Sequence, residues 1–144
     1  MKFLNTRLFI LLVLLGGMMT SCSKDSDDVG PALTGKWIIK SINYKTYVGN
    51  TLDEEETEDY SGVAYLEFKT NGTFVAKDED GSVDEFEYTY NASAQEVRVT
   101  DDDEVTVLKI QELTSSSLII YSEDSATSSG VTYKARVTFS CRRA

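Results

Sequence analysis

The chain has 144 residues, of which 41% are hydrophobic and 26% charged, and this length and composition are ordinary for one soluble globular domain preceded by a leader. It contains no His, which excludes mechanisms that need an imidazole base and the commonest zinc sites. Two Cys are too few for a disulfide scaffold. The formal net charge of −10 at pH 7 argues against nucleic acid as a partner.

The first segment has the pattern of an export signal. Lys2 and Arg7 precede an apolar run over residues 8–19, which is shorter than the roughly 20 residues that a membrane-spanning helix needs. The tetrapeptide Met-Thr-Ser-Cys that follows resembles the lipobox of bacterial lipoproteins, in which the Cys becomes the first mature residue and carries the lipid. We therefore expect a signal peptide over residues 1–21 and lipidation at Cys22. A plain signal peptide that leaves Cys22 as a free thiol is the alternative.

Residues 22–32 show no periodicity and are rich in Ser and Asp, which is typical of a flexible acidic tether. A Lys followed by acidic residues just after the lipid-bearing Cys resembles the surface-export signal of some Gram-negative lipoproteins. That resemblance implies a protein held in the outer membrane by its lipid and exposed at the cell surface. A solubilising spacer is the alternative.

From residue 33 onward the sequence is typical of antiparallel β structure. Turn residues separate runs rich in β-branched and aromatic residues, and no stretch has a sustained helical period. Asn71-Gly72 marks a tight hairpin. A short helix stays open as an interpretation of the long first loop, residues 45–62. The eight predicted strands are residues 36–44, 63–69, 73–77, 85–90, 96–100, 105–112, 118–122 and 131–141.

Short connections predict that strands adjacent in sequence pair with each other. Eight antiparallel strands in this order close most simply into an up-and-down β-barrel over residues 33–144, because closure leaves no open edge. Two packed four-stranded sheets are the alternative. Alternation along the strands turns a set of aromatic residues inward, namely Phe68, Phe74, Phe86, Tyr88, Tyr90 and Tyr133.

The start of the first strand, Gly35-Lys36-Trp37, resembles the Gly-X-Trp opening of lipocalins. The strand count, the meander and the long first loop agree with that family from residue 33 to the C-terminus. The resemblance implies a lipocalin-like barrel with Trp37 at its floor and an Arg from the end of the last strand beside it. Arg142 is the candidate for that Arg, since Arg136 points outward by parity.

Ligand binding inside the barrel is the first chemistry that the pattern allows. A cavity lined by Trp37 and the inward aromatic residues would take a small apolar ligand, and a fully packed interior is the alternative.

Divalent cation binding is the second. Asp78, Asp80, Asp84 and Glu87 have part of the spacing of an EF-hand loop, but Ala76 stands at the first ligand position and the flanks are strands. We therefore favour a solvated turn over a weak calcium site and expect no metal or cofactor.

Catalysis is not expected. After lipidation Cys141 is the one remaining thiol, its parity places it inward as a small apolar filler, and no His can act as its base. Acidic residues are abundant, but nothing in the sequence pairs two of them across a cleft as glycoside hydrolysis requires.

Acidic residues gather at one end of the expected barrel. In a meander the alternate connections share an end, and the first, third, fifth and seventh hold most of the 24 Asp and Glu. The other end, whose loops are expected to be uncharged and where Arg142 and Arg143 lie, is expected to face the membrane. The acidic rim is a candidate surface for a basic protein partner. The alternative function is therefore a non-catalytic interaction module or an accessory subunit of an outer-membrane complex. The rim is expected from residues 53–59, 78–85, 101–104 and 123–124.

Overall fold

A computed structural model of the protein describes residues 32–144. The predicted signal peptide, the lipidation site Cys22 and most of the tether lie outside these residues. No helix in residues 32–144 is long and apolar enough to cross a membrane. The strands are β1 (Gly35–Val48), β2 (Thr51–Asp59), β3 (Tyr65–Phe68), β4 (Thr73–Lys77), β5 (Val83–Asn91), β6 (Glu96–Asp101), β7 (Glu104–Leu113), β8 (Ser117–Ser128) and β9 (Val131–Arg143).

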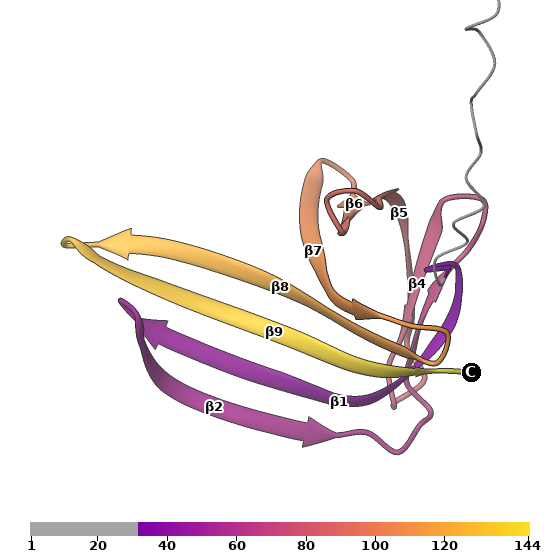
Figure 1. Cartoon of the computed structure of the whole chain (residues 1–144), viewed down its shortest axis with the longest axis horizontal. Helices are drawn as coiled ribbons and strands as arrows, with labels where there is room; N and C mark the ends of the chain where they lie inside the picture. Colours follow the sequence, from indigo (N-terminus) through magenta and orange to yellow (C-terminus); the bar gives the residue numbers. More distant parts are fainter. Residues whose placement is uncertain (1–31) are drawn as a thin grey trace, which may run out of the picture. The chain divides into compact units, whose positions relative to one another are not determined.

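Eight of these strands close into a barrel (Figure 1). They pair antiparallel in the order β1-β3-β4-β5-β6-β7-β8-β9, and β9 pairs back with β1. This closure confirms the predicted eight-stranded barrel and excludes the two-sheet alternative. The turn at Asn71-Gly72 joins β3 to β4 as predicted, with Gly72 in the left-handed region at a φ of 84°.

The expected long first loop contains the strand β2 instead. A two-residue turn, Gly49-Asn50, joins β1 to β2, and Gly49 has a φ of 63° that suits such a turn. β2 then pairs with β1 from Val48 back to Ser41. Residues 45–59 therefore belong to a β-hairpin, which excludes a short helix there.

Four strands extend past the barrel. β3 pairs with β1 only as far as Ile38, and β7 pairs with β8 only as far as Tyr121. Beyond these points β2, β1, β9 and β8 pair only with one another, and Figure 1 shows them running out together, away from β4 to β7. We call this part the projecting sheet and define it as residues 41–48, 51–59, 122–128 and 131–140.

The two ends of the barrel differ, and Trp37 with Arg143 closes the one that we call the floor. Trp37 is fully buried, and its indole N–H donates to the carbonyl of Leu33 at 2.8 Å. The Arg143 guanidinium lies 4.6 Å from the Trp37 ring centroid and donates to the carbonyls of Ala32 (3.0 Å) and Thr34 (2.8 Å). These contacts tie the segment before β1 to the end of β9.

The prediction that Arg142 lies beside Trp37 was wrong by one residue. β9 continues to Arg143, which pairs directly with Trp37 and therefore shares its face of the sheet. Arg142 takes the opposite face and is exposed. Arg136 points outward, as parity predicted, and pairs with Glu123.

Gly35 leaves room for the Arg143 guanidinium. Its φ is 126°, and a Cβ at this position would lie 2.8 Å from Nη2 of Arg143. We expect Gly35→Ala to lower the free energy of unfolding by about 3 kcal/mol, through backbone strain of about 1–2 kcal/mol and weakened charge-assisted hydrogen bonds. Urea denaturation followed by Trp37 fluorescence measures this loss.

Gly81→Ala is the matched control. Gly81 also has a positive φ, 92°, but a Cβ there meets nothing within 4 Å. Strain alone should cost about 1–2 kcal/mol at Gly81. Equal losses in the two variants would show that the contact of the added Cβ with the Arg143 guanidinium adds no measurable cost.

Candidate functional site

The barrel contains a cavity of about 440 Å³. This volume lies in the range of small-molecule sites. The rings of Phe74 and Phe86, with centroids 6.1 Å apart, form one part of its wall. The rest of the apolar wall consists of Ile39, Ile42, Leu66, Ala76, Val99, Leu108 and Phe139.

The cavity opens at the end of the barrel opposite the floor. Asp78, Asp101 and Glu104 line it there, together with Lys77 and Thr106. Three carboxylates against one ammonium group give this mouth a net negative charge. An apolar interior with a negative opening suits an amphipathic molecule better than a uniformly polar one.

The aromatic residues predicted to contact a ligand differ in their positions. Phe74 and Phe86 line the cavity, whereas Trp37, Phe68 and Tyr88 do not. The Phe68 ring centroid lies 4.9 Å from that of Phe74 and 5.3 Å from that of Tyr88, so these rings pack between the cavity and the floor. The Tyr88 hydroxyl donates to a backbone carbonyl at 2.9 Å, and burial raises its pKa. The interior is therefore packed at the floor and hollow near the mouth.

Tyr90 and Tyr133 occupy the face of their strands that parity predicted, but they do not line the cavity. Tyr90, near the end of β5, is 39% exposed. Tyr133 is 48% exposed and pairs with Val48 on the projecting sheet. Parity gives the face of a strand that a side chain occupies, but it does not say whether that part of the strand lies within the barrel.

The turn between β4 and β5 uses its carboxylates in local hydrogen bonds. Asp80 accepts hydrogen bonds from the backbone N–H (2.8 Å) and the hydroxyl (2.7 Å) of Ser82. Asp84 and Glu87 lie along β5 and not in the turn with Asp78. Within residues 32–144, no three Asp, Glu, Cys or His side chains are placed so that they could hold a metal ion. Asp80 therefore stabilises the turn through its hydrogen bonds with Ser82.

Cys141 is buried among core residues, as its parity predicted. Burial raises the pKa of its thiol to about 12. The thiol is therefore protonated at neutral pH and is a poor nucleophile.

The acidic residues predicted to form one rim are divided between two places. Asp78–Asp80 and Asp101–Glu104 lie at the connections around the mouth. Residues 53–59 lie on β2, and Glu123 and Asp124 lie on β8, because both segments are strands of the projecting sheet. The connections at the floor end, residues 69–72, 92–95 and 114–116, carry no carboxylate.

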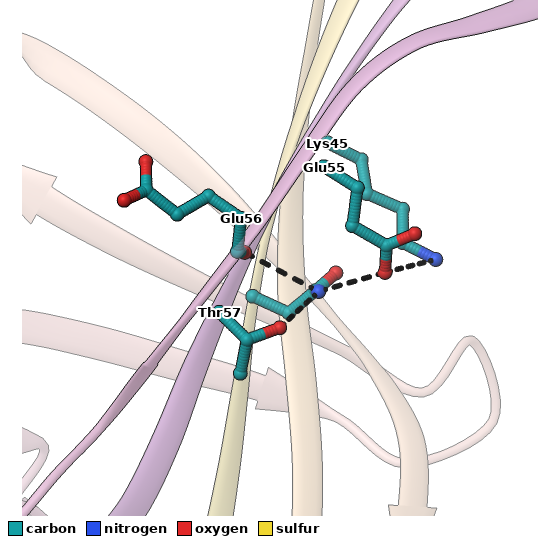
Figure 2. A network of polar contacts seen from close by, with 5 residues as sticks. Lys45, Glu55, Glu56 and Thr57 are labelled. Carbon is teal, nitrogen blue, oxygen red and sulfur yellow. Dashed lines mark hydrogen bonds and ion pairs between the residues drawn. The ribbon is translucent and has the colours of Figure 1, made fainter.

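One face of the projecting sheet, which we call the outer face, carries paired polar side chains. The Asn43 side-chain amide donates to Oε1 of Glu55 and to the hydroxyl of Thr57, both at 2.9 Å, and Nζ of Lys45 lies 3.1 Å from the same Glu55 oxygen (Figure 2). Hydrogen bonds from Asn43 and Lys45 lower the pKa of Glu55. This network joins β2, whose own sequence is a poor strand former, to β1.

The chain belongs to the family of lipocalin-like domains. The model of that family, described as the lipocalin-like domain, matches residues 33–120, which is more than half of the chain. Comparison with curated proteins finds no match, and comparison with solved structures finds none. The family match ends within β8, although the barrel closes only through β9.

The ion pair between Arg136 and Glu123 on the outer face should make the stability of the protein depend on pH. Arg136 donates to Oε2 of Glu123 from Nε (3.0 Å) and Nη2 (2.7 Å), and this hydrogen bonding lowers the pKa of Glu123. Because the folded pKa is the lower one, the pair stabilises the fold above the unfolded pKa, and this stabilisation is lost as the pH falls through the folded pKa. Solvent screening limits the contribution to about 0.5 kcal/mol. We expect Glu123→Gln to lower the free energy of unfolding by about 0.5 kcal/mol at pH 7 and to leave it unchanged at pH 2. Urea denaturation at the two pH values measures the difference.

Asp124→Asn is the control, because Asp124 is the next residue on the opposite face and forms no ion pair within the described chain. It should be neutral at both pH values. If Asp124→Asn lost as much stability as Glu123→Gln at pH 7, the change in the net charge of the protein would explain the effect, and the ion pair with Arg136 would not be needed to explain it.

Proposed function

We propose that this protein binds a small amphipathic molecule in its barrel, with the apolar part of the molecule in the cavity and its polar end at the acidic mouth. The observation that carries the proposal is the apolar cavity of about 440 Å³, with the carboxylates of Asp78, Asp101 and Glu104 at its mouth. Membership of the lipocalin-like family supports it, since this is generally a binding fold and not a catalytic one.

The proposal includes a place of action. We propose that the protein is anchored in the outer membrane through a lipid on Cys22 and is exposed at the cell surface. The lipobox resemblance and the composition of the tether support this location. The carboxylate-free connections and Arg143 at the floor are compatible with an orientation in which the floor faces the anionic head groups and the mouth faces outward.

Filling the cavity tests the binding proposal. The neutral dye N-phenyl-1-naphthylamine fluoresces in apolar sites, and Ala76 lines the cavity with a small side chain. We expect Ala76→Trp to weaken dye binding by about tenfold or more, because the indole would occupy the space that the dye needs. Fluorescence titration measures the affinity, and circular dichroism checks that the barrel is still folded.

Lys109→Trp is the control, since it adds the same side chain on the exposed side of β7. It should leave the dye affinity unchanged. A dye that binds Ala76→Trp as tightly as the wild-type protein would place the binding outside the cavity and contradict the proposal. If Ala76→Trp weakens dye binding as expected, native mass spectrometry after exposure to a lipid extract identifies the class of a natural ligand by its mass.

The charge of the mouth sets a preference among ligands. Asp101 and Glu104 lie where the polar end of a bound molecule would emerge. We expect dodecylamine to displace the dye about tenfold more effectively than dodecanoate, because an ammonium group is attracted to these carboxylates and a carboxylate is repelled.

In the double variant Asp101→Asn with Glu104→Gln, dodecylamine and dodecanoate should displace the dye almost equally well. Asp103 does not line the cavity, so Asp103→Asn should preserve the roughly tenfold difference between them. Equal displacement by the amine and the acid in the wild-type protein would count against a ligand whose polar end lies at the mouth.

A further inference from the structure

The second face of the projecting sheet, which we call the inner face, is apolar along the two central strands. It continues the surface that lines the barrel, because Ile42 and Phe139 border the cavity and the same faces of β1 and β9 carry on beyond them. Tyr44 of β1 pairs with Val137 of β9, and Val48 pairs with Tyr133. Tyr44, Val48 and Tyr133 are 36%, 38% and 48% exposed, so nothing in residues 32–144 covers this face.

The two outer strands border this apolar strip with carboxylates. The register places Glu54, Glu56 and Glu58 of β2 beside Thr46, Tyr44 and Ile42, on the inner face. Figure 2 shows the Glu56 side chain leading away from Glu55 and Lys45, toward that face. On the other side of the strip, Asp124 of β8 pairs with Ala135.

The positive charges of the projecting sheet all lie on the outer face. Lys45 and Arg136 pair with each other there, and Lys134 pairs with Tyr47 on the same side. Within the described residues of the sheet, the inner face therefore carries four carboxylates and no ammonium or guanidinium group. Burial, followed by the charges of Glu58, Asp78 and Glu56, raises the pKa of Tyr44, which agrees with a negative potential over this face.

The dimensions of the inner face match one helix. The seven residues from Ile42 to Val48 extend about 20 Å along the strand, and four strands span about 15 Å across. A helix with its side chains is about 10–12 Å wide, and about 14 residues of it, or four turns, extend about 20 Å. An amphipathic helix with basic residues beside its apolar stripe would bring apolar side chains over β1 and β9 and ammonium groups toward β2 and β8.

We propose that the inner face of the projecting sheet is a docking surface for a basic amphipathic helix of a partner protein. The apolar stripe of that helix covers Tyr44, Val48 and Tyr133. Its Lys or Arg side chains reach the carboxylates of Glu54 and Glu56 on one side and of Asp124 on the other. Hydrophobic burial supplies most of the affinity, and charge sets the orientation and the choice of partner.

The same charges disfavour two other occupants. A second copy packed face to face would bring the carboxylates of both copies into one apolar interface, which costs free energy because like charges repel and lose their water there. An anionic membrane surface would be repelled for the same reason. A basic helix instead pairs the charges that the face already presents.

A designed peptide tests the proposal on the full chain. The probe is a fluorescein-labelled peptide of about 14 residues, made of Leu and Lys in an amphipathic helical pattern. Its control has Glu in place of Lys. Fluorescence anisotropy should show saturable binding of the Lys peptide that weakens as salt is raised, and at least about tenfold weaker binding of the Glu peptide.

Two pairs of neighbouring substitutions separate the faces. Val48→Lys should weaken Lys-peptide binding by about tenfold, whereas Tyr47→Lys, which adds the same charge on the outer face, should change it less than about twofold. Glu54→Gln combined with Glu56→Gln should weaken binding by a similar factor. Glu55→Gln, on the outer face, should leave it unchanged. Circular dichroism shows which variants are folded and can be compared.

Three results would overturn the proposal. The first is equal peptide binding to Val48→Lys and Tyr47→Lys, which would make the attraction one of overall charge. The second is equal binding of the Lys and Glu peptides. The third is a wild-type dimer that Val48→Lys dissociates, because that would assign the inner face to a second copy of this chain.

Discussion

The stacking of the Arg143 guanidinium on the Trp37 indole is the contact on which the described structure depends. It joins the start of β1 to the end of β9. The same guanidinium donates to the carbonyls of Ala32 and Thr34, so a charged group beside a fully buried ring has hydrogen-bond partners and the segment before β1 is held in place. Because this end of the barrel is closed by packed side chains, the interior can open only at the other end. That opening lies among the acidic connections, whose carboxylates give the mouth its net negative charge.

The second constraint is that β1, β8 and β9 are longer than the barrel is tall. β1 uses its first residues to pair with β3 and its later residues to pair with β2, while β9 follows it along its other edge. The inward face of the barrel therefore continues as the inner face of the projecting sheet. Ile42 and Phe139 line the cavity, and Tyr44 and Val137 follow them on the same faces. The cavity and the proposed docking surface are two parts of one apolar surface that the same strands build.

Much of this fold could be predicted from periodicity. The alternation of Val131 to Cys141 and the Asn71-Gly72 turn gave a strand and a hairpin that the structure confirms. β2 was missed because six of its nine residues are Asp or Glu, which are poor strand formers with no apolar alternation, and its pairing with Asn43 and Lys45 is a tertiary effect. The available signal was Gly49-Asn50, a two-residue turn between two β-forming residues. The cavity was only partly predicted, since parity gives an inward face and cannot tell a residue that borders space from one that packs against Phe68.

The seam that closes the barrel joins the first strand of the described chain to the last. β1 pairs with β9 from Trp37 with Arg143 to Val48 with Tyr133, so every contact in this seam links residues far apart in sequence. During synthesis, β1 emerges early and has no partner along this edge until the thirteen residues of β9 have been made. Non-local pairings of this kind make folding slow and leave an exposed strand edge while the chain is incomplete. The barrel can therefore close only after β9 has been synthesised, because no other strand pairs with this edge of β1 over its whole length.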